Sequence, residues 1–376
     1  MLAALVISAA LAVPGAASAA PAPAASTPSD SVPVARGPVP PAPADRVPVA
    51  QEPVGRAPAV RAPVVQTPIA EEPVGRAPAV QVSVAPAPTA ARPVRLAPAA
   101  ADSITRAIGK DRADTREWLE KSNTSYLATV QRRDFEDRTT LTVGRAAGND
   151  VRIDDPEVAP HHLRVTVVGD SFRVAAVDPG ARFTVGDSAR REAVLPPSRI
   201  GIGRFLLRLS HQRFPAIIVF DPQSPRFAEY KGIAYFPADL AYRFALPLTA
   251  NAKTDTVIIM STRGNARRAV RVGWFDFLVG KTPCRLEATR LLEPGVGEED
   301  FGVFFRDATS GNESYGLGRY VDVQPLGGGR YVLDFNLAYN PACAYSEHYN
   351  CPIPPKGNTL KVAIRAGEKD SHYLAH

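Results

Sequence analysis

A proline recurs at every fifth position of the first quarter of this chain, from Pro23 to Pro98, and Ser83 is the one interruption of the period. Each proline fixes its own φ, lacks a backbone N–H and pushes the preceding residue out of the helical region. A continuous helix and a sheet ladder are therefore excluded over this stretch. We predict that residues 20–105 form a disordered Pro/Ala-rich tether with a polyproline II bias. Its period differs from PxxP spacing, which favours a spacer over a ligand for PxxP-type grooves.

The apolar run from Leu2 to Val13 is too short to span a bilayer but fits the hydrophobic segment of a signal peptide. Ala17 and Ala19 then offer small residues of the kind that signal peptidases require. We predict a signal peptide over residues 1–19 and an exported protein, periplasmic or secreted, whose tether places it near the cell wall or envelope. No lysine or arginine precedes the run, so a cytoplasmic location stays open as the alternative. We expect no transmembrane segment elsewhere.

Aromatic residues are absent before Trp118 and continue from there to Tyr373, so the hydrophobic core must come from about residues 110–370. That length fits one large domain or two small ones. The first hundred residues hold seven Arg and five acidic residues, which leaves about +4 of the formal net charge of +6 for the remainder. Neither a dense Lys/Arg stripe nor a nucleic-acid motif accompanies this mild excess, so we expect no nucleic-acid partner.

The first part of the globular region, residues 110–215, reads as one short helix followed by strands. The helix is predicted over Asp111–Ser122, with Trp118 and Leu119 as its packing residues. The strands are short, rich in β-branched residues and separated by Gly, Asp and Pro, which is typical of a β-sandwich. They are predicted at Tyr126–Val130, Thr140–Val143, Leu163–Val168, Phe172–Val177 and Phe205–Leu209.

Three motifs in this part carry a resemblance: Leu141–Arg145, Gly148–Ile153 and His162–Val165. Together they resemble a forkhead-associated (FHA) domain, a family that binds phosphothreonine through an Arg, a Ser and a later Asn. Arg145 matches the family's Arg, and His162 matches its structural histidine. Ala159 stands in the place of the Ser, and residues 179–183 replace the stretch with the Asn. The resemblance therefore implies the sandwich fold without phosphopeptide binding, because each missing charge-assisted hydrogen bond is worth about 1.5–3 kcal/mol.

The second part, residues 216–370, is predicted to be a further β-rich domain packed with the sandwich, so that the fold class is mainly all-β. Gly327–Gly329 is predicted to be the turn of a hairpin. Further strands are predicted at Tyr242–Leu248, Thr256–Ser261, Ala269–Trp274 and Arg285–Leu292.

Four long motifs of unusual composition lie in the second part, at residues 305–322, 334–345, 351–358 and 363–369. They strongly resemble a bacterial family known only as domain of unknown function sixteen-eighty-four, most clearly over residues 300–369. The family carries no established activity, so the resemblance implies a relative without implying a reaction.

Polar side chains are dense in two segments of this part, residues 306–322 and 334–351. Such a density indicates either the wall of a ligand pocket or a rigid polar network that holds a long loop. The preferred hypothesis is a non-catalytic binding or structural module, with an unknown ligand or protein partner, whose surface these segments line. The candidate surface residues are Arg306, Asp307, Thr309, Ser310, Glu313, Tyr315, Arg319, Asp322, Asp334, Asn336 and Asn340.

The alternative to a binding module is a hydrolase with Asp307, Glu313 or Asp334 as acid/base groups, because carboxylates near Arg can have separated pKa values. No nucleophile elbow, H-E-x-x-H motif, Walker loop or dinucleotide fingerprint accompanies them. Whether the protein is an enzyme stays open on this basis.

The three cysteines allow two interpretations. In an oxidising compartment Cys343 and Cys351 would form a small-loop disulfide and leave Cys284 free and buried. The weaker alternative is a metal or redox site that adds His348 to this pair. The eight-residue separation of the two cysteines does not fit the usual zinc spacing. The disulfide is therefore preferred, and no metal or other cofactor is expected.

Overall fold

The computed structural model describes residues 91–93 and 96–372, so the predicted signal peptide and the predicted tether up to residue 90 lie outside the described residues. The predicted short helix is the second half of a longer one, α1 (Pro98–Lys121). The tether prediction extends too far because the proline repeat stops at Pro98, and no proline follows until Pro156. A proline at the first helical position loses no intrahelical hydrogen bond, so Pro98 begins the helix instead of preventing it.

Two sheets form the predicted sandwich and enclose a common core, and β11 extends it to Phe220, beyond the boundary predicted at residue 215. Their strand orders are β1-β11-β10-β9-β6-β7 and β3-β2-β4-β5-β8, and the β2–β3 pair is parallel whereas the other pairs are antiparallel. The predicted strand over Tyr126–Val130 begins instead as a 3-10 turn, η1 (Tyr126–Ala128), before β1. The strands of the first sheet are β1 (Thr129–Asp134), β6 (Phe183–Val185), β7 (Ser188–Arg190), β9 (Ser198–Ile202), β10 (Phe205–His211) and β11 (Pro215–Phe220). Those of the second are β2 (Thr140–Gly144), β3 (Val151–Arg152), β4 (Leu163–Val168), β5 (Ser171–Ala176) and β8 (Glu192–Leu195).

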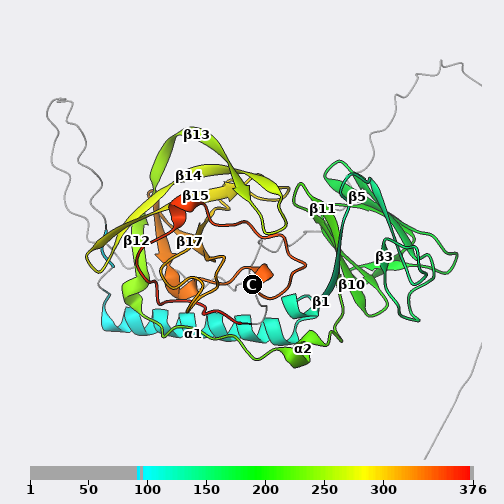
Figure 1. Cartoon of the computed structure of the whole chain (residues 1–376), viewed down its shortest axis with the longest axis horizontal. Coiled ribbons are helices and arrows are strands. Elements are labelled where there is room, and N and C mark those ends of the chain that lie inside the picture. Colours follow the sequence, from blue (N-terminus) through cyan, green and yellow to red (C-terminus); the bar gives the residue numbers. More distant parts are fainter. Residues whose placement is uncertain (1–90, 94–95, 373–376) are drawn as a thin grey trace, which may run out of the picture. The chain divides into compact units, whose positions relative to one another are not determined.

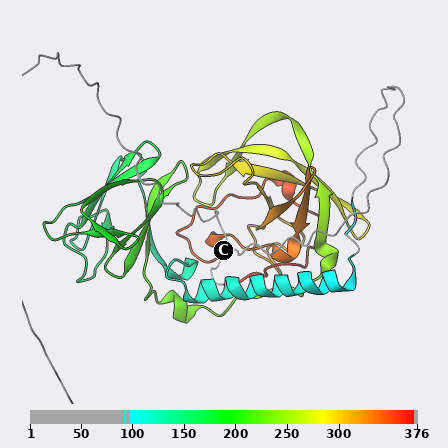
Figure 2. The ribbon, with the colours of Figure 1, turned by 180° about the vertical axis from the view of Figure 1, so that it is seen from behind.

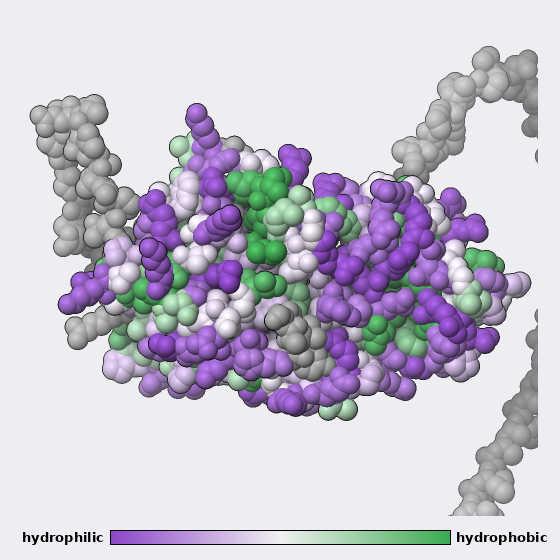
Figure 3. Space-filling view, viewed as in Figure 1, coloured by the Kyte–Doolittle hydropathy of each residue, from purple (hydrophilic) through white to green (hydrophobic). Residues whose placement is uncertain are grey.

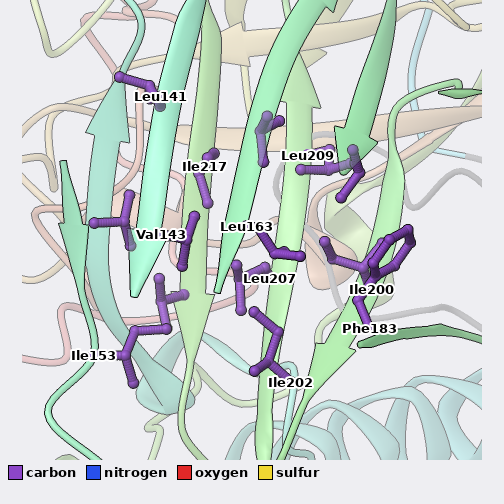
Figure 4. Packing of buried hydrophobic residues seen from close by; sticks show 14 of the residues in the cluster. Leu141, Val143, Ile153, Leu163, Phe183, Ile200, Ile202, Leu207, Leu209 and Ile217 are labelled. Atoms are coloured by element: carbon purple, nitrogen blue, oxygen red, sulfur yellow. The ribbon is translucent and has the colours of Figure 1, made fainter. Parts of the chain in front are cut away.

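The sandwich core comes from alternate residues of both sheets, as the period of two along a strand requires. Leu141, Val143 and Leu163 point inward from the second sheet, and Leu207 and Leu209 from the first (Figure 4). All five side chains are fully buried. Burial of this apolar area is the main term that stabilises the sandwich, and it confirms the predicted fold class here.

A curved, barrel-like sheet of seven strands forms the second domain, in the order β12-β18-β17-β16-β15-β14-β13. Bulges between Arg271 and Gly273 and between Ala250 and Asp255 bend its longest strands. The predicted hairpin turn is confirmed, since Gly327–Gly329 all have positive φ and join β17 to β18. The strands are β12 (Arg243–Pro247), β13 (Thr249–Met260), β14 (Ala266–Val279), β15 (Thr282–Leu291), β16 (Gly302–Phe305), β17 (Arg319–Gly327) and β18 (Arg330–Asp334).

Short helical turns lie before and after the strands of this sheet in the chain. They are α2 (Arg226–Glu229), η2 (Leu240–Tyr242), η3 (Phe335–Leu337), η4 (Ala342–Ala344) and η5 (Lys356–Asn358). A cluster of phenylalanines at the centre of the barrel packs mainly edge to face or tilted, the geometry that aromatic pairs prefer. Its members are Phe244, Phe277, Phe305 and Phe335.

Helix α1 precedes the sandwich in sequence but packs along the second domain (Figures 1 and 2). The Arg112 guanidinium donates a hydrogen bond to the Phe236 carbonyl oxygen at 2.9 Å. Ala91 forms a parallel bridge with Phe277 in β14. The sequence analysis grouped this helix with the sandwich because the two are adjacent in the chain. The Arg112–Phe236 hydrogen bond joins it instead to a residue 124 positions later, in the second domain. Among the described residues, none of the helices has both the length and the apolar composition that a membrane span requires.

Candidate functional site

Three loops meet at one end of the sandwich, and His162 ties them together. The imidazole Nδ1 accepts a hydrogen bond from the Ala159 backbone N–H at 2.9 Å. Its Nε2 lies 2.7 Å from the Arg182 carbonyl oxygen and donates to it, since Nδ1 is the acceptor. The ring is buried, so both of its nitrogens are paired inside the protein. His162 thus fixes the loop before β4 against the loop before β6, the structural role that the FHA resemblance implies.

Gly144 allows the third loop to approach the other two. A Cβ at this position would lie 2.9 Å from the Asn149 side-chain nitrogen and would overlap the Pro160 carbonyl oxygen. The next residue, Arg145, donates its backbone N–H to the Ala159 carbonyl oxygen at 3.0 Å. The Gly-Arg pair therefore ends β2 directly beside the segment that His162 holds.

Three cationic or titratable side chains lie on these joined loops. Arg145, His161 and Arg182 are all exposed. The His161 backbone N–H donates to the Asp178 carboxylate at 3.0 Å, which places one acidic group among them. Ala159 supplies no hydroxyl to this end of the sandwich. The arrangement can attract an anionic group by charge, without the hydroxyl donor that FHA domains use.

Most side chains of the predicted polar surface lie inside the second domain. Asp307 and Arg319 are both fully buried, with Arg319 Nη2 3.5 Å from Asp307 Oδ1. Asp307 also accepts hydrogen bonds from Thr309 Oγ1 at 2.8 Å and from the Ile364 backbone N–H at 2.5 Å. Ser310 Oγ donates to the same carboxylate at 3.2 Å. These bonds describe a rigid network more than the wall of an open pocket.

The Arg319 guanidinium completes this network from β17. It donates to the carbonyl oxygens of Ala366 at 2.5 Å, Ile364 at 2.8 Å and Glu368 at 3.1 Å. Burial lowers the pKa of Arg319, while Asp307 raises it. An arginine stays charged even so, and the three carbonyls and one carboxylate compensate that charge inside the protein. Arg319 therefore fastens the segment 364–368 to β17.

The remaining carboxylates of the predicted surface are each held by a separate partner. Glu313 pairs with Arg365 at 2.8 Å near the surface, and this hydrogen-bonded pair lowers the pKa of Glu313. Asp334, which is buried, pairs with Arg243 at 2.6 Å. Asp322 is exposed and accepts a hydrogen bond from the Tyr339 hydroxyl at 3.1 Å.

The other predicted surface residues divide between interior and exterior. Asn336 exchanges hydrogen bonds with the Asp239 backbone, through its Oδ1 at 2.8 Å and its Nδ2 at 2.8 Å. The Tyr315 hydroxyl donates to Cys343 Sγ at 3.6 Å, and burial raises the pKa of Tyr315. Arg306 is exposed, whereas Asn340 is buried and donates to the Lys369 carbonyl oxygen at 2.7 Å.

Sequence reasoning did not single out Glu368, one of several buried carboxylates that it missed. It accepts hydrogen bonds from the Asn340 backbone N–H at 2.7 Å and from the Tyr345 hydroxyl at 3.1 Å. Glu368 and Tyr235 also face each other in an isolated antiparallel bridge. Glu368 lies in the family motif at residues 363–369, which is the only sequence signal that pointed to it. The motif itself does not indicate whether the glutamate is buried or exposed.

The predicted disulfide between Cys343 and Cys351 is absent, and both residues are buried thiols, as is Cys284. Hydrogen bonds satisfy the two sulfurs instead. Cys351 Sγ accepts from the Cys343 backbone N–H at 3.3 Å, and burial raises the pKa of Cys351. The metal alternative also lacks a third ligand, because no group of three His, Cys, Asp or Glu side chains within residues 91–93 and 96–372 is placed to hold an ion.

Alkylation under denaturing conditions is expected to add three adducts to the intact mass of the purified protein, one for each thiol. Labelling of the native protein is expected to be far slower, because all three sulfurs are buried. A single adduct after denaturation, with a mass two hydrogens lower, would show that the two neighbouring thiols had been oxidised to the disulfide.

The fold and its joined loops define a two-domain β protein with an FHA-like sandwich before a barrel-like domain. Residues 228–369 match the model of a family described as "Protein of unknown function (DUF1684)". An uncharacterized protein of Haloarcula marismortui, solved by NMR, is 33% identical over 40% of this chain and 85% of that one, with a TM-score of 0.33. Through this segment the chain belongs to that family of unknown function, as the four motifs predicted.

Solved FHA domains are also among the similar structures. The FhaA FHA domain, complexed with the intracellular domain of another protein, is 20% identical over 21% of this chain and 78% of its own, with a TM-score of 0.17. EmbR of Mycobacterium tuberculosis, in complex with a low-affinity phosphopeptide, is 15% identical with a TM-score of 0.18. That match covers 34% of this chain and only 32% of EmbR. A comparison with curated proteins finds no match.

Proposed function

We propose that this chain is a non-catalytic binding protein whose FHA-like sandwich attracts an acidic protein partner at its joined loops. The observation that carries the proposal is the exposure of Arg145, His161 and Arg182 on three loops that His162 holds together. Rigid loops hold these side chains with little further ordering on binding, which favours affinity. Two permanent cations and one histidine suit a carboxylate-rich or phosphorylated segment.

The state of the carboxylates supports binding over the hydrolase alternative. A general acid or base must reach the proton of a substrate. Asp307 and Asp334 are buried and committed to Arg319 and Arg243, and Glu313 is paired with an arginine of its own. Each of the three carboxylates therefore already has an arginine partner, which supports a structural role for them over proton transfer to or from a substrate.

Exposed apolar residues are a second feature of the surface. Hydrophilic residues cover most of the face in Figure 3, and an apolar patch stands out among them at the top centre of the view. The large apolar side chains that stand exposed among the described residues are Val168, Val177, Val194, Ile258 and Met260, and the last two lie two positions apart on β13. Single exposed apolar residues are normal on soluble domains and define no interface by themselves.

Replacement of both Arg145 and Arg182 by alanine is expected to weaken binding of a fluorescein-labelled polyglutamate peptide about tenfold or more, equivalent to roughly 1.4 kcal/mol. Fluorescence anisotropy measures it, and the wild-type affinity is expected to fall with added salt because the contact is electrostatic. The matched control is Arg173→Ala, an exposed arginine on the sheet face that pairs with Glu192. An equal loss in the control would show non-specific attraction and would refute the proposed site.

The same assay separates an acidic partner from a phosphothreonine partner. The wild type is expected to bind a phosphothreonine peptide no better than a matched glutamate peptide, since Ala159 offers no hydroxyl. Ala159→Ser is expected to raise affinity for the phosphopeptide selectively, by about tenfold or more, because one hydrogen bond to a charged group is worth roughly 1.5–3 kcal/mol and about 1.4 kcal/mol corresponds to tenfold. A marked phosphopeptide preference in the wild type would contradict this part of the proposal.

A further inference from the structure

The Arg112 guanidinium lies in a seat built by the second domain. Its Nη1 donates to the Phe236 carbonyl oxygen at 2.9 Å, and its Nη2 to the Asn336 carbonyl oxygen at 3.4 Å. The guanidinium carbon lies 4.8 Å from the centre of the Tyr235 ring. Two carbonyl acceptors and an aromatic face are the partners that a planar, forked cation uses best.

Two buried carboxylates add negative charge to this seat. Asp334 and Glu368 both act on the charge of Arg112 and oppose the lowering of its pKa by burial, as do Tyr235 and Asp111. Asp334 lies two residues before Asn336 at the start of η3, and Glu368 faces Tyr235 in their bridge. Asp334 is also paired with Arg243 at 2.6 Å, so its charge is partly compensated. Arg112 is the cation that lies over the Tyr235 ring.

Arg112 occupies this seat with one of its donors unpaired. Its Nε is buried and has no hydrogen-bond partner among the described residues. Arg112 belongs to α1, in which only Ile108 and Leu119 are buried. In sequence, the whole sandwich lies between α1 and the residues of the seat. Arg112 thus comes from an element distant in sequence and keeps one donor unpaired. These two properties fit a side chain that binds a site on another domain better than they fit a core residue of that domain.

We infer that the second domain carries a guanidinium-binding site, formed by the Tyr235 ring and the Phe236 and Asn336 carbonyls, and that Arg112 occupies it in cis. The ligand class is a free or peptide-borne guanidinium. An ammonium group fits less well, since it has no planar fork to reach both carbonyls while it lies over the ring. The site is separate from the sandwich loops and does not rest on the function proposed for them.

Chemical rescue tests this site. Arg112→Ala is expected to lower the Tm of the second domain, and methylguanidinium at tens of millimolar is expected to restore at least half of the loss by saturable binding to the vacated seat. Methylammonium chloride at the same ionic strength is expected to restore much less. Wild-type protein is expected to show no rescue because Arg112 already fills the site. The matched control is Arg106→Ala, an exposed arginine on the same helix.

Several outcomes would overturn the inference. Equal stabilisation of the wild type or of Arg106→Ala would show a general effect of the additive, and equal rescue by methylammonium would show that the seat does not select a guanidinium. Absence of rescue in folded Arg112→Ala would show that no site exists. Should Arg112→Ala not fold, Arg112→Lys gives an independent measurement. Its Tm is expected to lie below that of the wild type, and an equal Tm would refute selection for the fork.

Discussion

Replacement of Arg319 by methionine is expected to destabilise the second domain by about 3–5 kcal/mol, because it leaves the buried Asp307 carboxylate without its cation. Three carbonyl oxygens in the segment 364–368 also lose their donor. The segment then has fewer bonds to β17, so we expect the second domain to unfold at much lower denaturant. Urea unfolding followed by circular dichroism and by tyrosine fluorescence measures this loss.

The matched control for this variant is Arg306→Met, which removes an exposed arginine from the same polar segment. It is expected to change the free energy of unfolding by less than about 0.5 kcal/mol, as surface substitutions usually do. The sandwich is expected to unfold as in the wild type, and a separate transition would reveal it. A stable Arg319→Met protein that had lost only a binding activity would contradict the network and favour the polar surface predicted from the sequence.

Replacement of Gly367 by alanine is expected to have an effect of similar size, above about 4 kcal/mol. Gly367 has a φ of +79°, and a Cβ there would lie 2.7 Å from the Phe335 carbonyl oxygen and closer still to that of Ala338. These neighbours are backbone atoms of η3 and of the residue after it, so they cannot move aside without displacing η3 itself. A clash added to left-handed strain falls in the range that is exceptional for single substitutions.

Gly329→Ala is the matched control, because Gly329 has a φ of +69° but, its chain neighbours aside, nothing within 4 Å of the point where a Cβ would lie. The change is expected to cost only the backbone strain of about 1–2 kcal/mol. Soluble expression and the urea midpoint of the two variants, measured side by side, separate strain from steric overlap. Equal effects at the two positions would mean that η3 moves to accommodate the new methyl group. That result would refute rigid packing between Gly367 and η3.

The strands of both domains were predictable in type because the signals for them are local. Alternation of apolar residues, β-branched composition and turn residues lie within a few positions of each strand, and β4 has the predicted bounds. The three glycines of the β17–β18 turn carry positive φ for the same local reason. The family motifs also have a local form, so the resemblance at residues 300–369 indicated the family whose model matches residues 228–369.

The polar segment shows where this reasoning ends. Nothing between residues 306 and 322 reveals whether Asp307 faces water or the Ile364 N–H, which lies 57 residues later. A ligand-pocket wall and a rigid polar network differ in which distant groups the polar side chains contact. Only those contacts decide between the two interpretations. The cysteines follow the same logic, since sequence spacing allowed a disulfide and the structure places hydrogen-bonded thiols.

The sequence by itself therefore determined the mainly β class, the resemblance of the sandwich and the family of the second domain. The tertiary structure decided that most of the polar segment is internal, that three carboxylates serve three separate arginines, and that α1 packs on the second domain. The physical reason is the range of the interactions. Strand and turn preferences act over a few residues, whereas burial of a charge depends on which distant groups compensate it.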